Sequence, residues 1–236
     1  MYHGETISGT CGLCNQSLPV TLRIWFVCPL CWNVVVAYQK SLVASSAIRG
    51  YWNEEVLPRF PDLELQETEE LQLKPFVRQA KTKREASKSL AALDFRVSRS
   101  QPPNSSPLFH IEQKSGPGAI EEMKEFQLDV NDYEDVVGAC LYTGYPAYIF
   151  HVQLTQEYES GTRRVVSRGI WYTDILRLRQ ELKRIAARRG EDKQAAYFRP
   201  SAFQPLKSFA SELESERYLQ LANEVKSSDL SLPGRL

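Results

Sequence analysis

Three side chains near the middle of the chain have the types and spacing to bind a divalent cation and a reactive water. Asp94 stands near the start of one apolar run, LDFRV, and Glu112 and Lys114 stand near the end of another, FHIEQK. Mg²⁺ and Mn²⁺ prefer oxygen ligands and keep several waters, so two carboxylates and a strand carbonyl can hold either ion beside a phosphate. Such an ion polarises phosphorus and makes its bound water more acidic. The residue types therefore indicate the chemistry of phosphodiester hydrolysis.

Strand alternation determines which side chains of FHIEQK lie together. Glu112 and Lys114 share one face of the expected strand, whereas Ile111 and Gln113 point the other way. Lys114 can then orient the attacking water or offset charge on the pentacovalent phosphate. An ammonium among carboxylates stays cationic unless burial dominates, so we assign Lys114 to electrostatic stabilisation.

This arrangement resembles the PD-(D/E)xK nuclease superfamily, the fold of many restriction endonucleases. The resemblance implies that Asp94 and Glu112 are the two acids of the motif and that Lys114 is its lysine. It further implies that Gln113 is the variable position, whose carbonyl contributes to the Mg²⁺ site. Leu93 departs from the proline common in the family, and the 17 residues between the acids require a long hairpin loop. Ordinary charges on a solvated sheet face are the alternative.

The elements that must position these residues follow the order helix, strand, strand, helix, strand. They are a helix over residues 75–93, two strands joined by the loop SRSQPPNSSP, a helix begun near Asp132 and Asp135 and ended at Gly144, and a strand over 146–154. The resemblance calls for this order, and it predicts a restriction-endonuclease-like α/β (α+β) fold with a mixed sheet flanked by helices. Glu85, His151 and Gln153 are further polar side chains that could approach the metal site.

Two Cys-x-x-Cys knuckles near the N-terminus predict a zinc site. They are Cys11 with Cys14 and, after 13 intervening residues, Cys28 with Cys31. Four thiolates suit one tetrahedral Zn²⁺ and leave no open position for a water, so the metal would be structural. Disulfides are the alternative, but no secretory signal precedes the knuckles. The fifth cysteine, Cys140, falls on an apolar helix face and is expected in the core.

The segments around the knuckles resemble a treble-clef or zinc-ribbon finger. TLRIWFV alternates like a strand, and a long helix is expected after Cys31. Basic residues are few here, so scaffolding or dimerisation suits the finger as well as DNA reading does. The predicted organisation is a finger with its helix over 1–58, an acidic linker over 59–75, a nuclease core over 76–190 and a C-terminal helical extension over 191–236.

A basic segment over residues 163–189 is the expected DNA-binding surface. RVVSRGIWY predicts a strand, Thr173 a helix cap, and Gly190 the stop of a basic amphipathic helix. The residues chosen as phosphate contacts on double-stranded DNA are Arg177, Lys183 and Arg184. A solvated helix face is the alternative, because most charge runs are no more than that.

Composition restricts the functional classes. The 236 residues include 29 Lys and Arg against 29 Asp and Glu, so DNA affinity must come from local patches. No apolar stretch is long enough to span a bilayer, which predicts a soluble, intracellular (cytoplasmic) protein without a membrane role.

The expected function is a Mg²⁺-dependent DNA endonuclease of restriction or mobile-element defence type, acting as a homodimer because a double-strand cut needs two active sites. Three other functions stay open. They are a transposition or recombination nuclease targeted by a partner protein, a nuclease for RNA or structured DNA, and a non-catalytic zinc-finger binding module.

Overall fold

A computed structural model describes most of the chain. It covers residues 6–10, 17–23, 25–27, 29–68, 93–101, 106–159, 162–188 and 193–227. Side chains are described from Lys40 onward, apart from residues 141–142 and 158–164. Three of the four knuckle cysteines, Cys11, Cys14 and Cys28, lie outside the described residues, as does the side chain of Cys31. Residues 69–92, which include Glu85 and nearly all of the helix expected before Asp94, lie outside them too.

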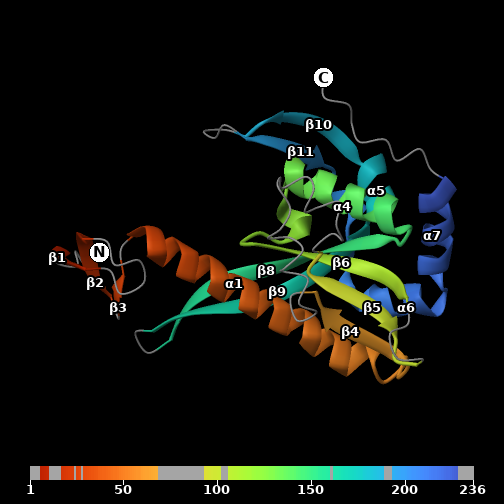
Figure 1. Cartoon of the computed structure of the whole chain (residues 1–236), viewed down its shortest axis with the longest axis horizontal. Helices are drawn as coiled ribbons and strands as arrows, with labels where there is room; N and C mark the ends of the chain where they lie inside the picture. The colour runs from red at the N-terminus through yellow and green to blue at the C-terminus, as the bar shows by residue number, and fades with distance from the viewer. Residues whose placement is uncertain are drawn as a thin grey trace.

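Six strands form one mixed sheet in the order β12-β9-β8-β6-β5-β4 (Figure 1). Their bounds are β4 Leu63–Glu67, β5 Phe95–Arg99, β6 Pro107–Gly116, β8 Ala147–Glu159, β9 Thr162–Asp174 and β12 Gln204–Pro205. Strands β6 and β8 pair in parallel, while the other neighbours pair antiparallel. Aromatic and β-branched residues dominate the first half of β8, as suits a strand buried on both faces. The predicted mixed α+β fold, with helices flanking a mixed sheet, is confirmed.

Two three-stranded antiparallel sheets accompany the large one. Their strands are β1 Thr6–Thr10, β2 Ser17–Arg23 and β3 Trp25–Val27 in the first, and β7 Phe126–Asp129, β10 Leu182–Ala187 and β11 Gln194–Phe198 in the second. The sequence predicted a single strand across TLRIWFV. The structure divides this segment between β2 and β3, which pair antiparallel with Thr21 opposite Val27.

Helices cover both faces of the large sheet. They are α1 Pro29–Tyr51, α4 Val130–Thr143, α5 Ile175–Gln180, α6 Phe209–Glu214 and α7 Arg217–Ser227. Short helical turns are η1 Trp52–Val56, η2 Ile120–Glu122, η3 Pro200–Ala202 and η4 Leu206–Ser208. Helix α1 matches the long helix expected after Cys31. Among the described helices, none combines the length and the apolar character that crossing a bilayer would need.

The two faces of the sheet bury separate hydrophobic clusters. Ile111 and Phe150 pack with α1, α6 and part of α7 on one face. Ile149 packs with α4, α5 and the β10-β11-β7 sheet on the other. Successive residues of one strand thus belong to opposite clusters, as pleating requires. Because Ile111 faces α1, its neighbours His110 and Glu112 face α4.

Helix α4 follows the predicted course. Its first turn carries Asp132, and it ends at Gly144, whose φ of 71° is a left-handed conformation that glycine adopts readily. The Gly144 amide donates a hydrogen bond of 2.8 Å to the Cys140 carbonyl. Cys140 is fully buried in the α4 cluster, as expected, and burial raises the pKa of its thiol to about 12.

The prediction of a basic amphipathic helix from Thr173 to Gly190 is wrong over most of that range. The N-cap is Asp174, whose side chain accepts the Arg177 amide, and α5 ends at Gln180. Residues 182–187 then form β10, which pairs with β11. Leu182 and Ile185 both pack on the α4 cluster because the β10–β11 register shifts between Leu182 and Arg184, a bulge that reverses the alternation.

The segments predicted as an acidic linker and a C-terminal helical extension both contribute strands and buried residues to the core. The acidic segment 59–75 contains β4, in which Leu63 is buried and the whole strand pairs with β5. Residues 194–227 are not purely helical, since β11 pairs with β7 and β12 with β9. Phe198 and Phe209 from this part are fully buried in the two main clusters.

Candidate active site

The β5–β6 hairpin brings Asp94 beside the E-x-K segment. Phe95 lies opposite Ile111, so the residue before Phe95 meets the residues after Ile111. The Gln113 amide donates a hydrogen bond of 2.6 Å to Asp94 Oδ2. The structure therefore joins two residues that are 19 positions apart in the sequence.

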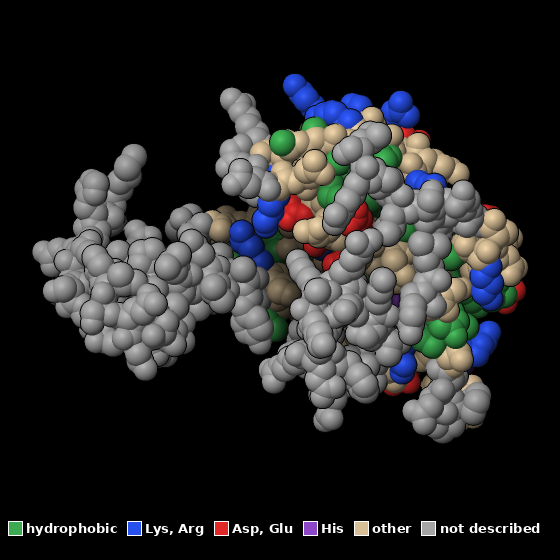
Figure 2. All heavy atoms as spheres, turned by 45° about the horizontal axis from the view of Figure 1, so that its top comes forward, with side chains coloured by type: hydrophobic (Ala, Val, Ile, Leu, Met, Phe, Trp, Pro, Cys, Tyr) green, Lys and Arg blue, Asp and Glu red, His purple; other side chains and the backbone are tan. Residues whose placement is uncertain are grey.

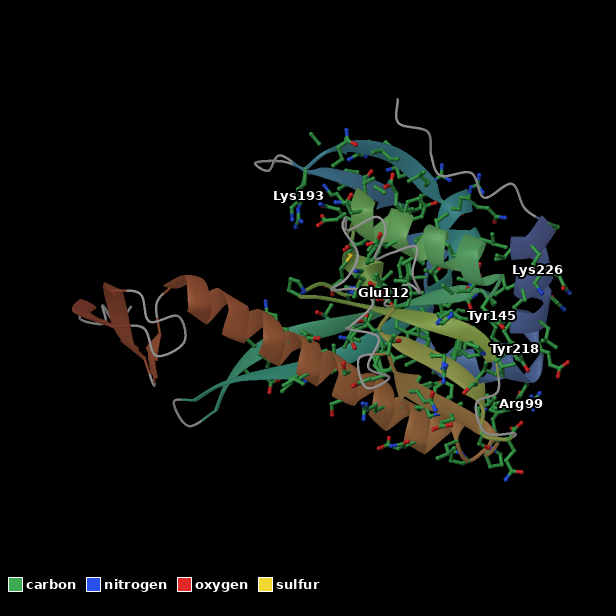
Figure 3. The ribbon with its side chains drawn as sticks, viewed as in Figure 1. Arg99, Glu112, Tyr145, Lys193, Tyr218 and Lys226 are labelled. Carbon is green, nitrogen blue, oxygen red and sulfur yellow. The ribbon has the colours of Figure 1, made fainter. Side chains whose placement is uncertain are left out.

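Glu112 and Lys114 form an ion pair on the α4 face of β6. Lys114 Nζ lies 2.7 Å from Glu112 Oε1, and the exposed fractions of the two side chains are 23% and 12%. Glu112 is labelled near the centre of Figure 3, among strands of the large sheet. The predicted alternation is confirmed, since Ile111 is buried in the α1 cluster and Gln113 turns toward α1.

Asp132 is the member of the site that the sequence did not suggest. It lies in the first turn of α4, and its Oδ2 is 3.0 Å from Lys114 Nζ. The ammonium is thus held between two carboxylates from different elements. The only sequence signal was an acidic residue suited to a helix N-terminus, and that pattern says nothing about which strand the helix end approaches.

The positive charge near Glu112 does not fully offset the burial of its carboxylate and the nearby charge of Asp94. Burial, and then the nearby charge of Asp94, raises the pKa of Glu112 to about 8, although Lys114 acts in the opposite direction. Burial alone would lower the pKa of Lys114, but the Glu112 and Asp132 carboxylates outweigh it and raise that pKa. Lys114 is therefore a fixed cation at neutral pH, and a further cation beside Glu112 would favour the charged form of that carboxylate.

Helix α1 holds Gln113 from the opposite face of the strand. Ser45 Oγ donates a hydrogen bond of 3.0 Å to Gln113 Oε1, and Gln113 Nε2 donates one of 3.3 Å to the Ser41 carbonyl. With its amide also bonded to Asp94, Gln113 is fixed at three points. Its backbone carbonyl, which a cation beside Glu112 could use, is fixed with it.

His151 and Gln153 lie on the same face as Glu112 but hold a loop and not the acids. His151 is the partner of Lys114 in the β6–β8 ladder, and Gln153 is the partner of Gly116. His151 Nε2 is 3.1 Å from the Gly118 carbonyl, and Gln153 Nε2 donates to the Pro117 carbonyl at 3.5 Å. These two side chains anchor the turn that follows β6.

The donor set suits a cation that keeps several waters. Within the described part of the chain, no three His, Cys, Asp or Glu side chains gather closely enough to hold a metal by themselves. Asp94 and Glu112 offer two carboxylates, and Gln113 offers a carbonyl. A hard ion that retains water ligands fits so few protein oxygens better than a zinc ion does.

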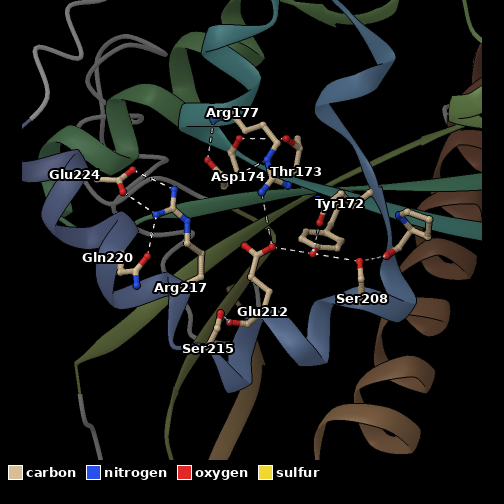
Figure 4. A network of polar contacts seen from close by, with 12 residues as sticks. Tyr172, Thr173, Asp174, Arg177, Ser208, Glu212, Ser215, Arg217, Gln220 and Glu224 are labelled. Atoms are coloured by element: carbon tan, nitrogen blue, oxygen red, sulfur yellow. Dashed lines mark hydrogen bonds and ion pairs between the residues drawn. The ribbon is translucent and has the colours of Figure 1, made fainter.

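The three basic residues predicted to bind DNA do not form one surface. Lys183 and Arg184, on β10, both pair with Glu125, at 2.5 and 2.6 Å. Arg177 instead belongs to a separate, partly buried network of polar contacts with Asp174 and Glu212 (Figure 4). Positively charged side chains are visible along the upper edge of the body in Figure 2.

No family model matches the chain, and no curated protein matches it. Among solved structures, the chain is similar to a nuclease from a fusselovirus, with a TM-score of 0.37 and 14% sequence identity over 82% of this chain and 95% of that one. A likeness of this size assigns neither a family nor an activity.

Proposed function

We propose that the chain is a divalent-metal-dependent DNA endonuclease that hydrolyses phosphodiester bonds. The observation that carries the proposal is Glu112, a largely buried carboxylate whose pKa is raised to about 8 beside a second carboxylate, Asp94. Two such groups at one point favour the binding of a cation. Lys114, an ammonium anchored on both sides, lies next to them.

Asp94, Glu112 and the Gln113 carbonyl would hold a Mg²⁺ or Mn²⁺ ion. When bound, such an ion supplies Lewis acidity toward the phosphate and a more acidic water. The residues of the chain do the rest. Asp94 and the Gln113 amide fix each other, and Ser45 and Ser41 orient the strand from α1.

Lys114 has an electrostatic role in this proposal. Its raised pKa keeps the ammonium charged, so it cannot accept a proton from water at neutral pH. A preorganised cation beside the scissile phosphate would instead offset the charge that develops on the phosphoryl oxygens. Asp132 holds the ammonium in place for this purpose.

The first test is a cleavage assay with purified full-length protein. Supercoiled plasmid is incubated with Mg²⁺, with Mn²⁺, with Ca²⁺ or with EDTA, and the ends of the products are sequenced. We expect cleavage with Mg²⁺ or Mn²⁺ and none with EDTA. Equal cleavage in EDTA, or intact double-stranded and single-stranded DNA under every condition, would contradict the proposal.

The narrower proposal is a restriction or defence nuclease that cuts double-stranded DNA as a homodimer. One chain supplies one Asp94, Glu112 and Lys114 set, whereas a double-strand cut needs two. Light scattering on a short duplex should therefore give the mass of two chains. A monomer that only nicks would overturn the dimer and leave the hydrolytic site standing.

A structural Zn²⁺ held by Cys11, Cys14, Cys28 and Cys31 is proposed from the sequence spacing. A metal assay on protein purified without chelator should find about one zinc per chain. Cys31→Ser should release that zinc, whereas Cys140→Ser, at the buried fifth cysteine, should retain it. No zinc in the wild-type protein, or disulfides between the knuckles, would exclude the site.

A further inference from the structure

A groove of about 420 Å³ lies where helix α1 passes β6, β8 and β9 (Figure 1). Its walls come from α1, from the end of β6 and the turn after it, and from the β8–β9 hairpin: Lys40, residues 115–117, residues 154–156 and Val165. We call it the α1 groove. Because its wall includes Ser115, the residue after Lys114, the groove adjoins the candidate active site from the α1 side of the sheet.

Lys40 gives the α1 groove a net positive charge. Among the described residues that line the groove, Lys40 alone has a charged side chain, and no carboxylate in the described part of the chain pairs with its ammonium. Arg168 reaches Thr155 of the wall, but it pairs with Glu157, so these two charges cancel. The groove therefore favours an anion of one negative charge, such as a phosphodiester.

Two hydroxyl groups of the wall can donate to such an anion. Ser115 lies two residues after Gln113, whose side chain turns toward α1, so alternation places the Ser115 hydroxyl on the Lys40 side of the sheet. The Thr155 hydroxyl accepts a hydrogen bond of 3.3 Å from Arg168 Nε, which leaves its own hydrogen available. An ammonium with hydroxyl donors is a common set of phosphate contacts in DNA-binding proteins.

The backbone of β6 leads from the two acids to the groove. Strand β5 pairs with β6 as far as Ile111, and the Gln113 amide, which points to the β5 side, donates to Asp94. The Ser115 amide points the same way, because backbone groups alternate along a strand, and no described strand lies opposite it. A substrate strand that passes the acids along this edge would next meet Ser115.

The rest of the groove is largely apolar. Leu154 is buried and Val165 partly buried in the α1 cluster, and Pro117 adds a third apolar side chain. A cation and hydroxyl groups beside an apolar wall suit a deoxyribose ring with its phosphate. The volume lies near the small end of the usual range for ligand sites, about 300–1,000 Å³, which suits one sugar-phosphate unit and not a duplex.

We propose that the α1 groove binds a backbone phosphate of the DNA strand that is cut, with this phosphate at Lys40 and the Ser115 hydroxyl. Ser115 is three residues beyond Glu112, about 10 Å along the strand, so the phosphate belongs to a neighbouring nucleotide and not to the scissile bond. Such a contact fixes the position of the strand without reading its sequence. This inference rests on the proposed nuclease function and deepens it, because it names the part of the substrate that is held beside the cut.

The test is a series of DNA oligonucleotides, each with one uncharged methylphosphonate linkage near the cut, digested by wild type and by Lys40→Gln. In wild type, one neighbouring linkage should raise KM about 10-fold, as for loss of one hydrogen bond to a charged group. Lys40→Gln should raise KM similarly on unmodified DNA with kcat retained. That linkage should then have little further effect, because both changes remove the same contact. Lys40→Arg should restore most of the loss.

Lys207→Gln is the matched control, because Lys207 is an exposed lysine that does not line the groove and, like Lys40, has no carboxylate partner among the described residues. It should respond to every linkage as wild type does. Ser115→Ala should raise KM by a smaller factor than Lys40→Gln. If no linkage loses its effect in Lys40→Gln, or if Lys207→Gln behaves as Lys40→Gln does, the inference is overturned. The proposed function fails separately, if wild type does not cleave the unmodified oligonucleotide with Mg²⁺.

Discussion

Two charged clusters lie on opposite faces of the same sheet, and they differ in what their charges are used for. Glu112, Lys114 and Asp132 lie on the α4 face, where Lys114 and Asp132 line a pocket of about 300 Å³. Tyr172 and Glu212 lie on the other face, where the Tyr172 hydroxyl donates to Glu212 at 2.8 Å. Figure 4 shows how this second cluster links β9, α5 and α6 through Asp174 and Arg177.

The second cluster serves the fold. Asp174 Oδ1 accepts the Arg177 amide at 2.8 Å, so the acid caps α5, and Glu212 fixes α6 to β9 through Tyr172. In the first cluster Glu112 pairs with Lys114 and still has a raised pKa, because burial and Asp94 oppose its charge. A buried acid therefore suggests chemistry when its neighbours leave it short of positive charge and a pocket opens beside the cation that it pairs with.

The largest expected effect is the loss of cleavage when an acid of the first cluster is substituted, compared with substitution of an acid in the second cluster. Glu112→Gln should reduce metal-dependent cleavage about 1,000-fold or more, because it removes a charged ligand, while the fold is kept. Asp94→Asn should do the same. Glu212→Gln should leave kcat unchanged but lower the free energy of unfolding by about 1 kcal/mol, since its charge-assisted hydrogen bond is weakened. Initial cleavage rates and urea titrations of all three variants check this, and undiminished cleavage by Asp94→Asn would remove the acids from the site.

A smaller effect is expected at the anchored lysine. Lys114→Met should reduce kcat about 100- to 1,000-fold, the range for loss of one preorganised electrostatic group. Asp132→Asn should cost about 10- to 100-fold, as for a residue that orients another. The two losses should not add, because Asp132 acts through Lys114. Fully additive losses in the double variant would show that Asp132 acts by itself.

The pH dependence of stability should also distinguish the clusters. Glu112 has its pKa raised from 4.5 to about 8, so the folded protein binds this proton more tightly than the unfolded chain does. The stabilisation is complete below about pH 4.5 and is lost as the pH rises through about 8. In EDTA, the free energy of unfolding should fall over this window, and Glu112→Gln should flatten the fall. Glu212→Gln should keep the wild-type slope, and a Glu112→Gln profile parallel to wild type would contradict the assignment.

The smallest effect concerns DNA affinity. Neutralising Lys183 or Arg184, which both pair with Glu125, should reduce the salt dependence of binding by about one counterion each. Arg177→Gln should leave that slope unchanged, because Arg177 pairs with Asp174 and Glu212 in the second cluster. Filter binding of a short duplex at several salt concentrations measures both. A reduced slope only in Arg177→Gln would reverse the comparison.

Local patterns predicted the strands and the helix at the centre of the fold, because each of these elements depends on residues that are close together in the sequence. The alternation of FHIEQK placed Glu112 and Lys114 on one face, and the Gly144 stop and the aromatic run of β8 defined their elements. The helix prediction for residues 175–188 failed because apolar residues recur there with helical spacing, at Ile175, Leu178, Leu182 and Ile185. A bulge in β10 satisfies the same spacing in a strand, and only pairing with β11 selects it.

The sequence by itself therefore determined which side chains share one face of β6, because alternation is a property of one segment. The α+β class followed from the order of helices and strands along the chain, which the resemblance called for. The tertiary structure decided everything that depends on distant segments meeting. It brought Asp132 to Lys114, Ser45 to Gln113, and Asp129 to Arg188. It also paired the partly exposed Arg177 with Asp174 and Glu212, because a charge pattern along the chain does not say which acids the packed elements will present to it.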